Sequence, residues 1–285
     1  MYQKVKIHTD APEWRYIPDV EYKNYDGLSR KLQMIVPCRP NWDCDERFPL
    51  IVYLPGSAFY KQDMYANIPN LGSLAQRGYV VAMLQYRESE LAKFPAQIQD
   101  VNHALSFLKE KAKEFHIDSG NIFLMGHSSG GYNALMAGFT AELPEFSCGA
   151  VHTVSAVVGA SAPSYLNYGA CVPRLGYSDY DPEDFRPELD MLGLNRFEED
   201  LPLTEKAMVE TYVRQDRAIP PVMLLHGDAD GDVTVENSRK LYRRLVDAGK
   251  EVRFVELEGQ GHGGAMLWDR VFIDLVHDFL QTHRK

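Results

Sequence analysis

The chain has 285 residues, of which 45% are hydrophobic and 25% charged, and 30 basic against 40 acidic residues give a formal net charge of −10. This composition excludes a chain that is disordered or collagen-like throughout, and the length suffices for a full hydrophobic core. The acidic balance argues against nucleic acid or an anionic membrane surface as the main partner.

The first residues, MYQKVKIHTDAPEWRY, lack the apolar stretch of a signal peptide, and no apolar run approaches the ~18 residues of a membrane-spanning helix. We therefore expect a cytoplasmic protein without membrane contact. The four cysteines form no Cys-x-x-Cys pair, so neither a zinc site nor a disulfide framework is indicated. Nothing in the sequence sets the oligomeric state.

Strand and helix patterns alternate along most of the chain. A strand at 31–36 follows a turn signal at 25–27. Further strands are predicted at 49–54, 79–84, 121–125, 150–158, 221–225 and 252–257, and helices at 64–77, 96–115, 130–142, 234–248 and 265–281. The continuous apolar runs of the strands are typical of burial on both faces. This order predicts an α/β fold, with a mostly parallel central sheet flanked by helices on both faces.

The alternation is interrupted at 160–219, which is acidic, contains prolines and shows only short helical patterns near 203–215. Ligands of such sheets bind at the carboxyl ends of the strands. We therefore interpret 160–219 as a lid or cap within a single domain, 1–285; an insertion without a function is the alternative. Its aromatic residues either stack on a ligand or pack the lid onto the core: Tyr165, Tyr168, Tyr177, Tyr180, Phe185, Phe197 and Tyr212. Its acidic run at 176–200 is expected to be a solvated face.

A nucleophile is indicated where the strand 121–125 meets the next helix. The segment Gly126-His-Ser-Ser-Gly130 has the Gly-x-Ser-x-Gly spacing of a nucleophile elbow. The sharp turn raises the Ser128 hydroxyl above the sheet, and glycines on either side remove side chains that would clash. The helix that follows directs its free amides at the reacting centre.

Serine requires a histidine base, and the base requires a carboxylate that orients it. His262 lies among glycines in the loop after the strand 252–257, where it can reach Ser128. Three acids, Asp228, Asp230 and Asp232, crowd the loop after the strand 221–225. Chain geometry alone does not choose among them, and all three also suit a turn.

These residues together resemble the α/β-hydrolase superfamily, over nearly the whole chain from about residue 25. The resemblance is strongest to small acyl esterases of the acetylesterase and feruloyl-esterase type, which are related to prolyl oligopeptidase. The segments that carry it are Gly126–Gly131, Tyr86-Arg87 with Phe94-Pro-Ala96 and Asp100, His226-Gly227 with Asp230 and Val233, and Gly261-His262-Gly263. The pattern His-Gly-x-x-Asp-x-x-Val implies Asp230 as the triad acid, with Asp232 as the second choice.

The chain departs from this resemblance after the first buried strand. Such esterases often carry His-Gly-Gly-Gly followed by an aromatic residue, where this chain has Pro55-Gly-Ser-Ala-Phe59. Backbone amides form an oxyanion hole, so serine and alanine can serve. We expect the amide of Ser57 or Ala58 to act with the amide of Ser129; alternatively, 55–56 is only a turn. Phe59, Tyr60 and His127 are candidates for the substrate pocket.

The resemblance implies a serine carboxylesterase that hydrolyses short-chain acyl esters, with acetyl expected, of a carbohydrate or small alcohol. It implies no metal or organic cofactor, and a small-molecule partner such as an acetylated oligosaccharide. An arylformamidase and a small peptidase of the prolyl-oligopeptidase type share these motifs, although the peptidases carry a propeller for which 285 residues leave no room. A non-catalytic binding protein is a further alternative. Such proteins usually lack one of the three catalytic residues, whereas Ser128, Asp230 and His262 are all present in this chain.

Overall fold

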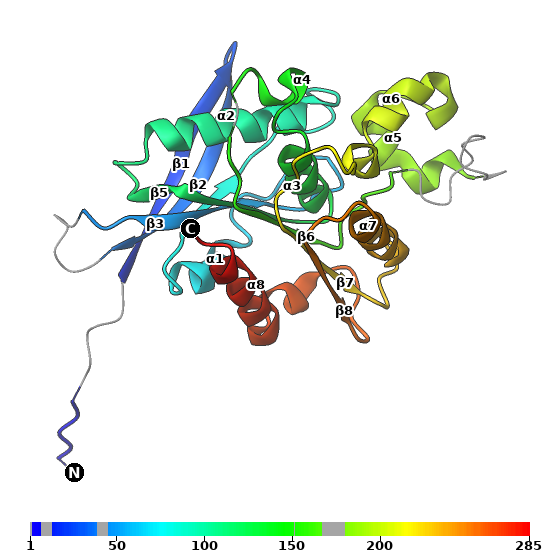
Figure 1. Cartoon of the computed structure of the whole chain (residues 1–285). Coiled ribbons are helices and arrows are strands. Elements are labelled where there is room, and N and C mark those ends of the chain that lie inside the picture. Colours follow the sequence, from blue (N-terminus) through cyan, green and yellow to red (C-terminus); the bar gives the residue numbers. More distant parts are fainter. Residues whose placement is uncertain (1, 7–12, 39–44, 151, 167–179) are drawn as a thin grey trace.

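The computed structural model describes residues 2–6, 13–38, 45–150, 152–166 and 180–285. Within them, eight strands form one sheet in the order β1-β2-β4-β3-β5-β6-β7-β8 (Figure 1). The strands are β1 (Glu13–Tyr25), β2 (Leu28–Cys38), β3 (Phe48–Leu54), β4 (Val80–Leu84), β5 (Ile117–His127), β6 (Ala156–Ala160), β7 (Val222–Gly227) and β8 (Val252–Leu257). The strands from β4 to β8 pair in parallel with their neighbours, whereas β1–β2 and β2–β4 are antiparallel. The predicted mostly parallel sheet is confirmed.

The N-terminal strands form a hairpin longer than the sequence indicated. β1 and β2 flank the predicted turn, in which Asp26 and Gly27 both have a positive φ, 49° and 95°. A turn of this hand matches the twist of the two strands that it joins. The strand expected at 150–158 begins later, at Ala156.

The α-helices of the described residues are α1 (Ile68–Ala75), α2 (Ala96–Glu110), α3 (Ser129–Phe139), α4 (Pro144–Ser147), α5 (Arg186–Leu192), α6 (Leu201–Lys206), α7 (Glu236–Asp247) and α8 (Arg270–Thr282). All five predicted helices exist, with shorter or shifted bounds. The helix expected from residue 64 starts at Ile68, because the Asp63 carboxylate accepts hydrogen bonds from the Tyr65 and Ala66 amides in a preceding turn. The last helix starts at Arg270, after a 3₁₀ turn at Gly264–Trp268.

Two apolar cores lie on the two faces of the sheet. Alternate residues of β3 point to opposite faces, so Leu50 and Val52 join one core and Ile51 and Tyr53 the other. The first core includes side chains of α2, α3 and α7, and the second includes those of α1 and α8. This three-layer arrangement is visible in Figure 1 and leaves the ends of the parallel strands free for a site.

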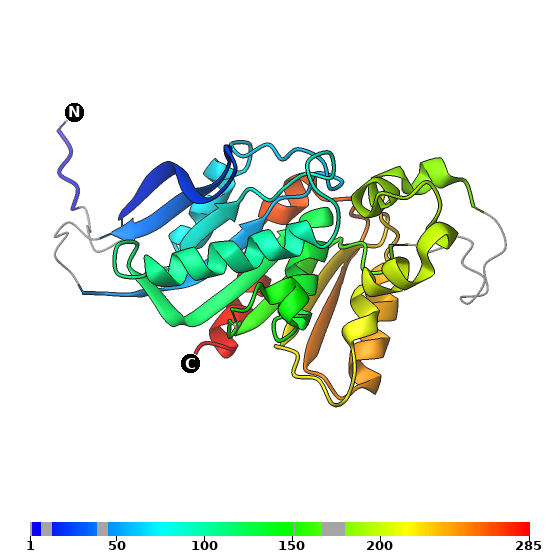
Figure 2. The ribbon, with the colours of Figure 1, turned by 90° about the horizontal axis from the view of Figure 1, so that it is seen from above.

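The described part of 160–219 holds short helical elements. These are 3₁₀ turns at Pro182–Phe185, Phe197–Asp200 and Val209–Tyr212, together with α5 and α6. Figures 1 and 2 place α5 and α6 at the opposite end of the molecule from β1 and β2. The rings of Tyr180, Phe185 and Phe197 pack on one another with centroids 5.7 to 5.8 Å apart. These aromatics therefore pack the segment itself, while Tyr168 and Tyr177 lie outside the described residues.

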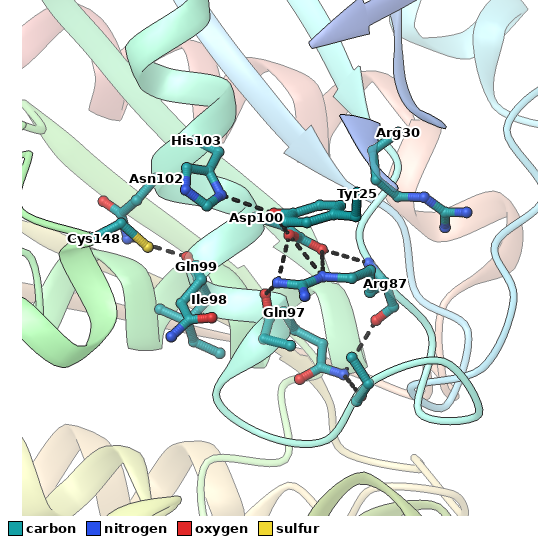
Figure 3. A network of polar contacts seen from close by, with 12 residues as sticks. Tyr25, Arg30, Arg87, Gln97, Ile98, Gln99, Asp100, Asn102, His103 and Cys148 are labelled. Carbon is teal, nitrogen blue, oxygen red and sulfur yellow. Dashed lines mark hydrogen bonds and ion pairs between the residues drawn. The ribbon is translucent and has the colours of Figure 1, made fainter. Parts of the chain in front are cut away.

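A buried network holds the connection between β4 and α2 (Figure 3). Asp100 is fully buried and accepts hydrogen bonds from the Arg87 amide at 2.7 Å and from the Arg87 guanidinium at 2.9 to 3.0 Å. The Tyr25 hydroxyl bridges Asp100 and His103 Nδ1, at 2.5 and 2.8 Å. This network ties β1 to α2.

No helix among the described residues is long and apolar enough to cross a membrane.

Candidate active site

The sharp turn at Ser128 lies between β5 and α3, as predicted. Ser128 has φ 54° and ψ −129°, a backbone conformation that non-glycine residues rarely adopt. A Cβ on Gly126 would lie 2.2 Å from the Gly130 carbonyl oxygen, and a Cβ on Gly130 would lie 2.1 Å from that of Leu54. Both glycines are therefore required by close packing of backbone against backbone.

Loops after β7 and β8 bring two further groups to Ser128. His262 Nε2 lies 2.9 Å from Ser128 Oγ, and His262 Nδ1 lies 2.8 Å from Asp230 Oδ2. An ionised carboxylate only accepts hydrogen bonds, so Nδ1 carries the proton and Nε2 accepts from the serine. His262, which is 134 positions from Ser128 and 32 from Asp230 in the sequence, thus links the two in one hydrogen-bonded chain.

The three aspartates of the β7 loop occupy different positions. Asp228 Oδ1 accepts from the Gly259 amide at 2.6 Å and so joins this loop to the loop that carries His262. The exposed Asp232 lies on the wall of a cavity, and its amide donates to Asp230 at 3.0 Å. Of the three, only Asp230 contacts His262 in the structure.

Several donors hold the Asp230 carboxylate. Its Oδ1 accepts from the Val233 amide at 2.9 Å, and its Oδ2 lies 3.1 Å from His226 Nε2. Desolvation alone would raise its pKa, but the hydrogen bonds from His226, His262 and Val233 outweigh burial and hold the pKa of Asp230 well below its usual range. His226 was part of the sequence resemblance, but its contact with Asp230 became visible only in the folded chain.

His127 lies next to the serine on the cavity wall. Its ring packs against that of His262 with centroids 4.9 Å apart. Burial and the neighbouring His262 lower the pKa of His127 to about 4, so its ring is neutral at pH 7. His127 therefore adds no positive charge to the cavity wall beside Ser128.

The loop after β3 carries the candidate oxyanion amides. Ala58 and Phe59 both have a positive φ, 50° and 64°, which is strained for side chains of this kind. The Ser57 amide donates to Ser129 Oγ at 3.0 Å, so it is already engaged. The sequence analysis named the Ser57 and Ala58 amides as alternatives for the oxyanion hole, and the amide of Ala58 is the remaining candidate. Ser129 is the first residue of α3, where an amide has no acceptor within the helix.

The Tyr86 hydroxyl lies beneath this loop in a position that the sequence did not indicate. It donates to the Pro55 carbonyl at 2.8 Å and lies 3.2 Å from Ser129 Oγ, from which it can accept. A chain of hydrogen bonds therefore runs from the Ser57 amide through Ser129 and Tyr86 to Pro55. The Ser57 hydroxyl donates to the Tyr60 carbonyl at 2.6 Å, which joins the two ends of the turn at 57–60.

A cavity of about 360 Å³ opens above Ser128. Its wall includes 56–59, 127–129, Pro163, Val233 and His262, together with Asp184, Pro187 and Glu188 from the inserted segment and Asp232. Phe59 and His127, two of the candidates for the substrate pocket, line this cavity. Tyr60 does not line it; its hydroxyl donates to Asp190 at 2.7 Å, because the strained turn at 58–59 directs this side chain toward α5.

A comparison with known families assigns the chain. The BD-FAE family model matches residues 40–245, well over half of the sequence. The chain belongs to the BD-FAE family. The fold of this BD-FAE family member is that of an α/β-hydrolase, which confirms the predicted fold class. A truncated form of a carbohydrate esterase from gut microbiota superposes with a TM-score of 0.80 at 23% identity over 99% of each chain.

Further similarities point to proteins named as esterases. A thermophilic esterase from Thermogutta terrifontis, Est2, superposes with a TM-score of 0.72 at 22% identity, covering 96% of this chain and 93% of that one. Esterase LipQ of Mycobacterium tuberculosis is 26% identical over 96% of this BD-FAE family chain. The chain spans 64% of the length of LipQ and 54% of that of Esterase LipC from the same organism.

Proposed function

We propose that this protein is a serine carboxylesterase that hydrolyses short-chain acyl esters, chiefly acetyl esters, of a carbohydrate or another small alcohol. The observation that carries the proposal is the hydrogen-bonded series Ser128–His262–Asp230 at the floor of a cavity of about 360 Å³. Distances of 2.8 and 2.9 Å suit proton transfer between these groups. The esterase names of the relatives support the same reaction class.

In the proposed first step, Ser128 Oγ attacks the ester carbonyl while its proton passes to His262 Nε2. Asp230 keeps Nδ1 protonated and stabilises the imidazolium that forms. The amides of Ala58 and Ser129 donate to the oxyanion of the tetrahedral intermediate. His262 then protonates the departing alcohol oxygen, and an acyl-enzyme on Ser128 remains.

In the second step, His262 takes a proton from water, and the resulting hydroxide attacks the acyl carbonyl. The tetrahedral intermediate releases the acid, and the proton returns from His262 to Ser128 Oγ. Every step uses side chains and amides of this chain together with water. Among the described residues, no group of three or more His, Cys, Asp or Glu side chains is arranged to hold a metal ion.

In the proposed enzyme, the segment 160–219 acts as a cap over the cavity. It contributes Asp184, Pro187 and Glu188 to the cavity wall. The cavity volume lies at the lower end of the range of small-molecule sites, roughly 300–1,000 Å³, which suits a short acyl chain. The carbohydrate esterase among the structural neighbours supports a sugar as the alcohol half.

The first test is hydrolysis of p-nitrophenyl esters of increasing chain length and of acetylated xylo-oligosaccharides, with Ser128→Ala as the control. We expect kcat/KM to be highest for acetate and to fall for chains longer than butyrate. We also expect Ser128→Ala to lose at least about 10⁴-fold in kcat while it remains folded by circular dichroism. Higher activity on N-formylkynurenine, or on a proline-containing peptide amide, would assign a different reaction.

A further inference from the structure

Glu188 is a carboxylate on the cavity wall that has no partner from another residue within the described part of the chain. It belongs to α5 and lines the same cavity as Ser128 and His262. Among the described residues, no other residue donates a hydrogen bond to its carboxyl group, whose one contact is with its own backbone amide. Glu188 therefore faces the cavity with unused acceptor capacity.

The other charged residues of α5 show that this arrangement is specific to Glu188. Arg186 and Asp190, one turn apart on the helix, form an ion pair at 2.9 Å. Asp190 also accepts from the Tyr60 hydroxyl at 2.7 Å. These two residues have partners within the protein, whereas the Glu188 carboxylate between them has none among the residues that the structure describes.

The described residues of the cavity wall bring no lysine or arginine to Glu188. The other titratable groups of the cavity wall are Asp184, Asp232, His127 and His262, and neither lysine nor arginine is among the described wall residues. Burial raises the pKa of the Glu188 carboxyl to about 7. An acid held in this way is stabilised either by a proton or by a ligand that donates hydrogen bonds.

We propose that Glu188 is a specificity-determining residue that accepts hydrogen bonds from hydroxyl groups on the alcohol half of the substrate. This inference rests on the proposed esterase function and extends it. The substrate class is an acetyl ester of an alcohol that carries several further hydroxyl groups. Glu188 binds and orients this alcohol and takes no part in the transfer of the acyl group.

Three kinds of alcohol would behave differently at this wall. A polyhydroxylated alcohol donates charge-assisted hydrogen bonds to the ionised carboxylate. An apolar alcohol would bury Glu188 without a partner, and an anionic alcohol would be repelled by Asp184, Glu188 and Asp232. An ammonium-bearing alcohol would also satisfy the carboxylate, so the experiment must separate it from a neutral one.

The test compares 6-O-acetylglucose with cyclohexyl acetate, which have six-membered rings with and without hydroxyl groups. Glu188→Leu is expected to raise KM for 6-O-acetylglucose roughly tenfold or more, with kcat little changed, and to leave KM for cyclohexyl acetate equal or lower. Glu188→Gln keeps the shape and one acceptor, so its KM for the sugar ester should be intermediate. Glu183→Gln, an exposed carboxylate on the adjacent turn Pro182–Phe185 that does not line the cavity, is the matched control and should change KM by less than about twofold.

The pH dependence supplies a readout that a merely structural role would not change. Hydroxyl donors stabilise the ionised carboxylate, which predominates above its pKa. KM for 6-O-acetylglucose should therefore fall as the pH rises through about 7 in the wild type, and this step should be absent in Glu188→Gln. Cyclohexyl acetate should show the step in neither protein.

Equal changes in KM for the two esters in Glu188→Leu would overturn the inference. A preference for acetylcholine over 6-O-acetylglucose that is lost in Glu188→Gln would replace hydroxyl recognition with cation recognition. Wild-type protein that hydrolyses neither ester nor p-nitrophenyl acetate would instead contradict the proposed function itself, so the two failures are distinguishable.

Discussion

Two polar clusters in this chain combine the same kinds of group, an aspartate, a histidine and a hydroxyl, in different surroundings. In the cavity, Asp230, His262 and Ser128 follow one another at 2.8 and 2.9 Å. Between β1 and α2, the Tyr25 hydroxyl lies between Asp100 and His103 at 2.5 and 2.8 Å (Figure 3). Short distances between such groups therefore do not by themselves distinguish a reactive site from a structural one.

The difference lies in what each cluster faces. Arg87 neutralises Asp100 and its guanidinium stacks over the Tyr25 ring at 4.0 Å, so the second cluster is complete without a ligand. Burial and the Asp100 charge raise the pKa of Tyr25 far above its ordinary value, which keeps its hydroxyl protonated. The Ser128 hydroxyl instead stands on a strained turn, at a cavity, with an unprotonated imidazole nitrogen as acceptor. Of the two clusters, the one at Ser128 is therefore the one that we propose reacts with a substrate.

The largest expected effect separates the clusters by activity. Asp230→Asn should lower kcat for p-nitrophenyl acetate about 10⁴-fold, because an amide no longer holds His262 in the required tautomer. Asp232→Asn is the matched control, two residues away in the same loop, and should keep kcat within about fivefold because its carboxylate does not contact His262. A large loss in Asp232→Asn with normal activity in Asp230→Asn would exchange the two roles.

The second effect is on stability. Asp100→Asn leaves the Arg87 guanidinium half-buried without its counter-charge, so the free energy of unfolding in urea should fall by about 3–5 kcal/mol. The protein that remains folded at low temperature should keep kcat within about tenfold. Glu114→Gln removes an exposed ion pair with Lys111 and should cost less than about 1 kcal/mol. Unchanged stability with a lost kcat in Asp100→Asn would place this network in the reaction.

The smallest effect concerns the loop that carries Ala58. Tyr86→Phe and Tyr22→Phe each remove a buried hydroxyl that donates to a backbone carbonyl, at 2.8 Å to Pro55 and 2.7 Å to Gln85. Each should cost about 1 kcal/mol of unfolding free energy. Only Tyr86→Phe should also lower kcat, by up to about tenfold with KM unchanged, because its hydroxyl contacts Pro55, Ser57 and Ser129, which flank the candidate oxyanion amides. Equal kcat in both variants would contradict this role.

The strength of sequence inference differed between local and long-range features. The glycines at 126 and 130 act on backbone within a few residues and on the strand beside it, so their spacing alone predicted the turn at Ser128. Helix bounds were less predictable, since the Asp63 turn and the 3₁₀ turn before α8 depend on local hydrogen bonds that periodicity does not record. Tyr60, a candidate for the substrate pocket, is not among the lining residues of the cavity at Ser128; its hydroxyl contacts Asp190, and it follows the two positive-φ residues Ala58 and Phe59.

The sequence by itself determined the class of the sheet, the position of Ser128 and the identity of His262 as its candidate partner. Apolar runs, glycine spacing and chain order carry this information locally. The choice of Asp230 among three neighbouring aspartates came from the family resemblance, and its contact with His262 is seen only in the tertiary structure. Only the tertiary structure decided that the Ser57 amide is engaged and that Glu188 lines the cavity. Each of these depends on directions of side chains and amides that are set when segments up to 134 residues apart pack together.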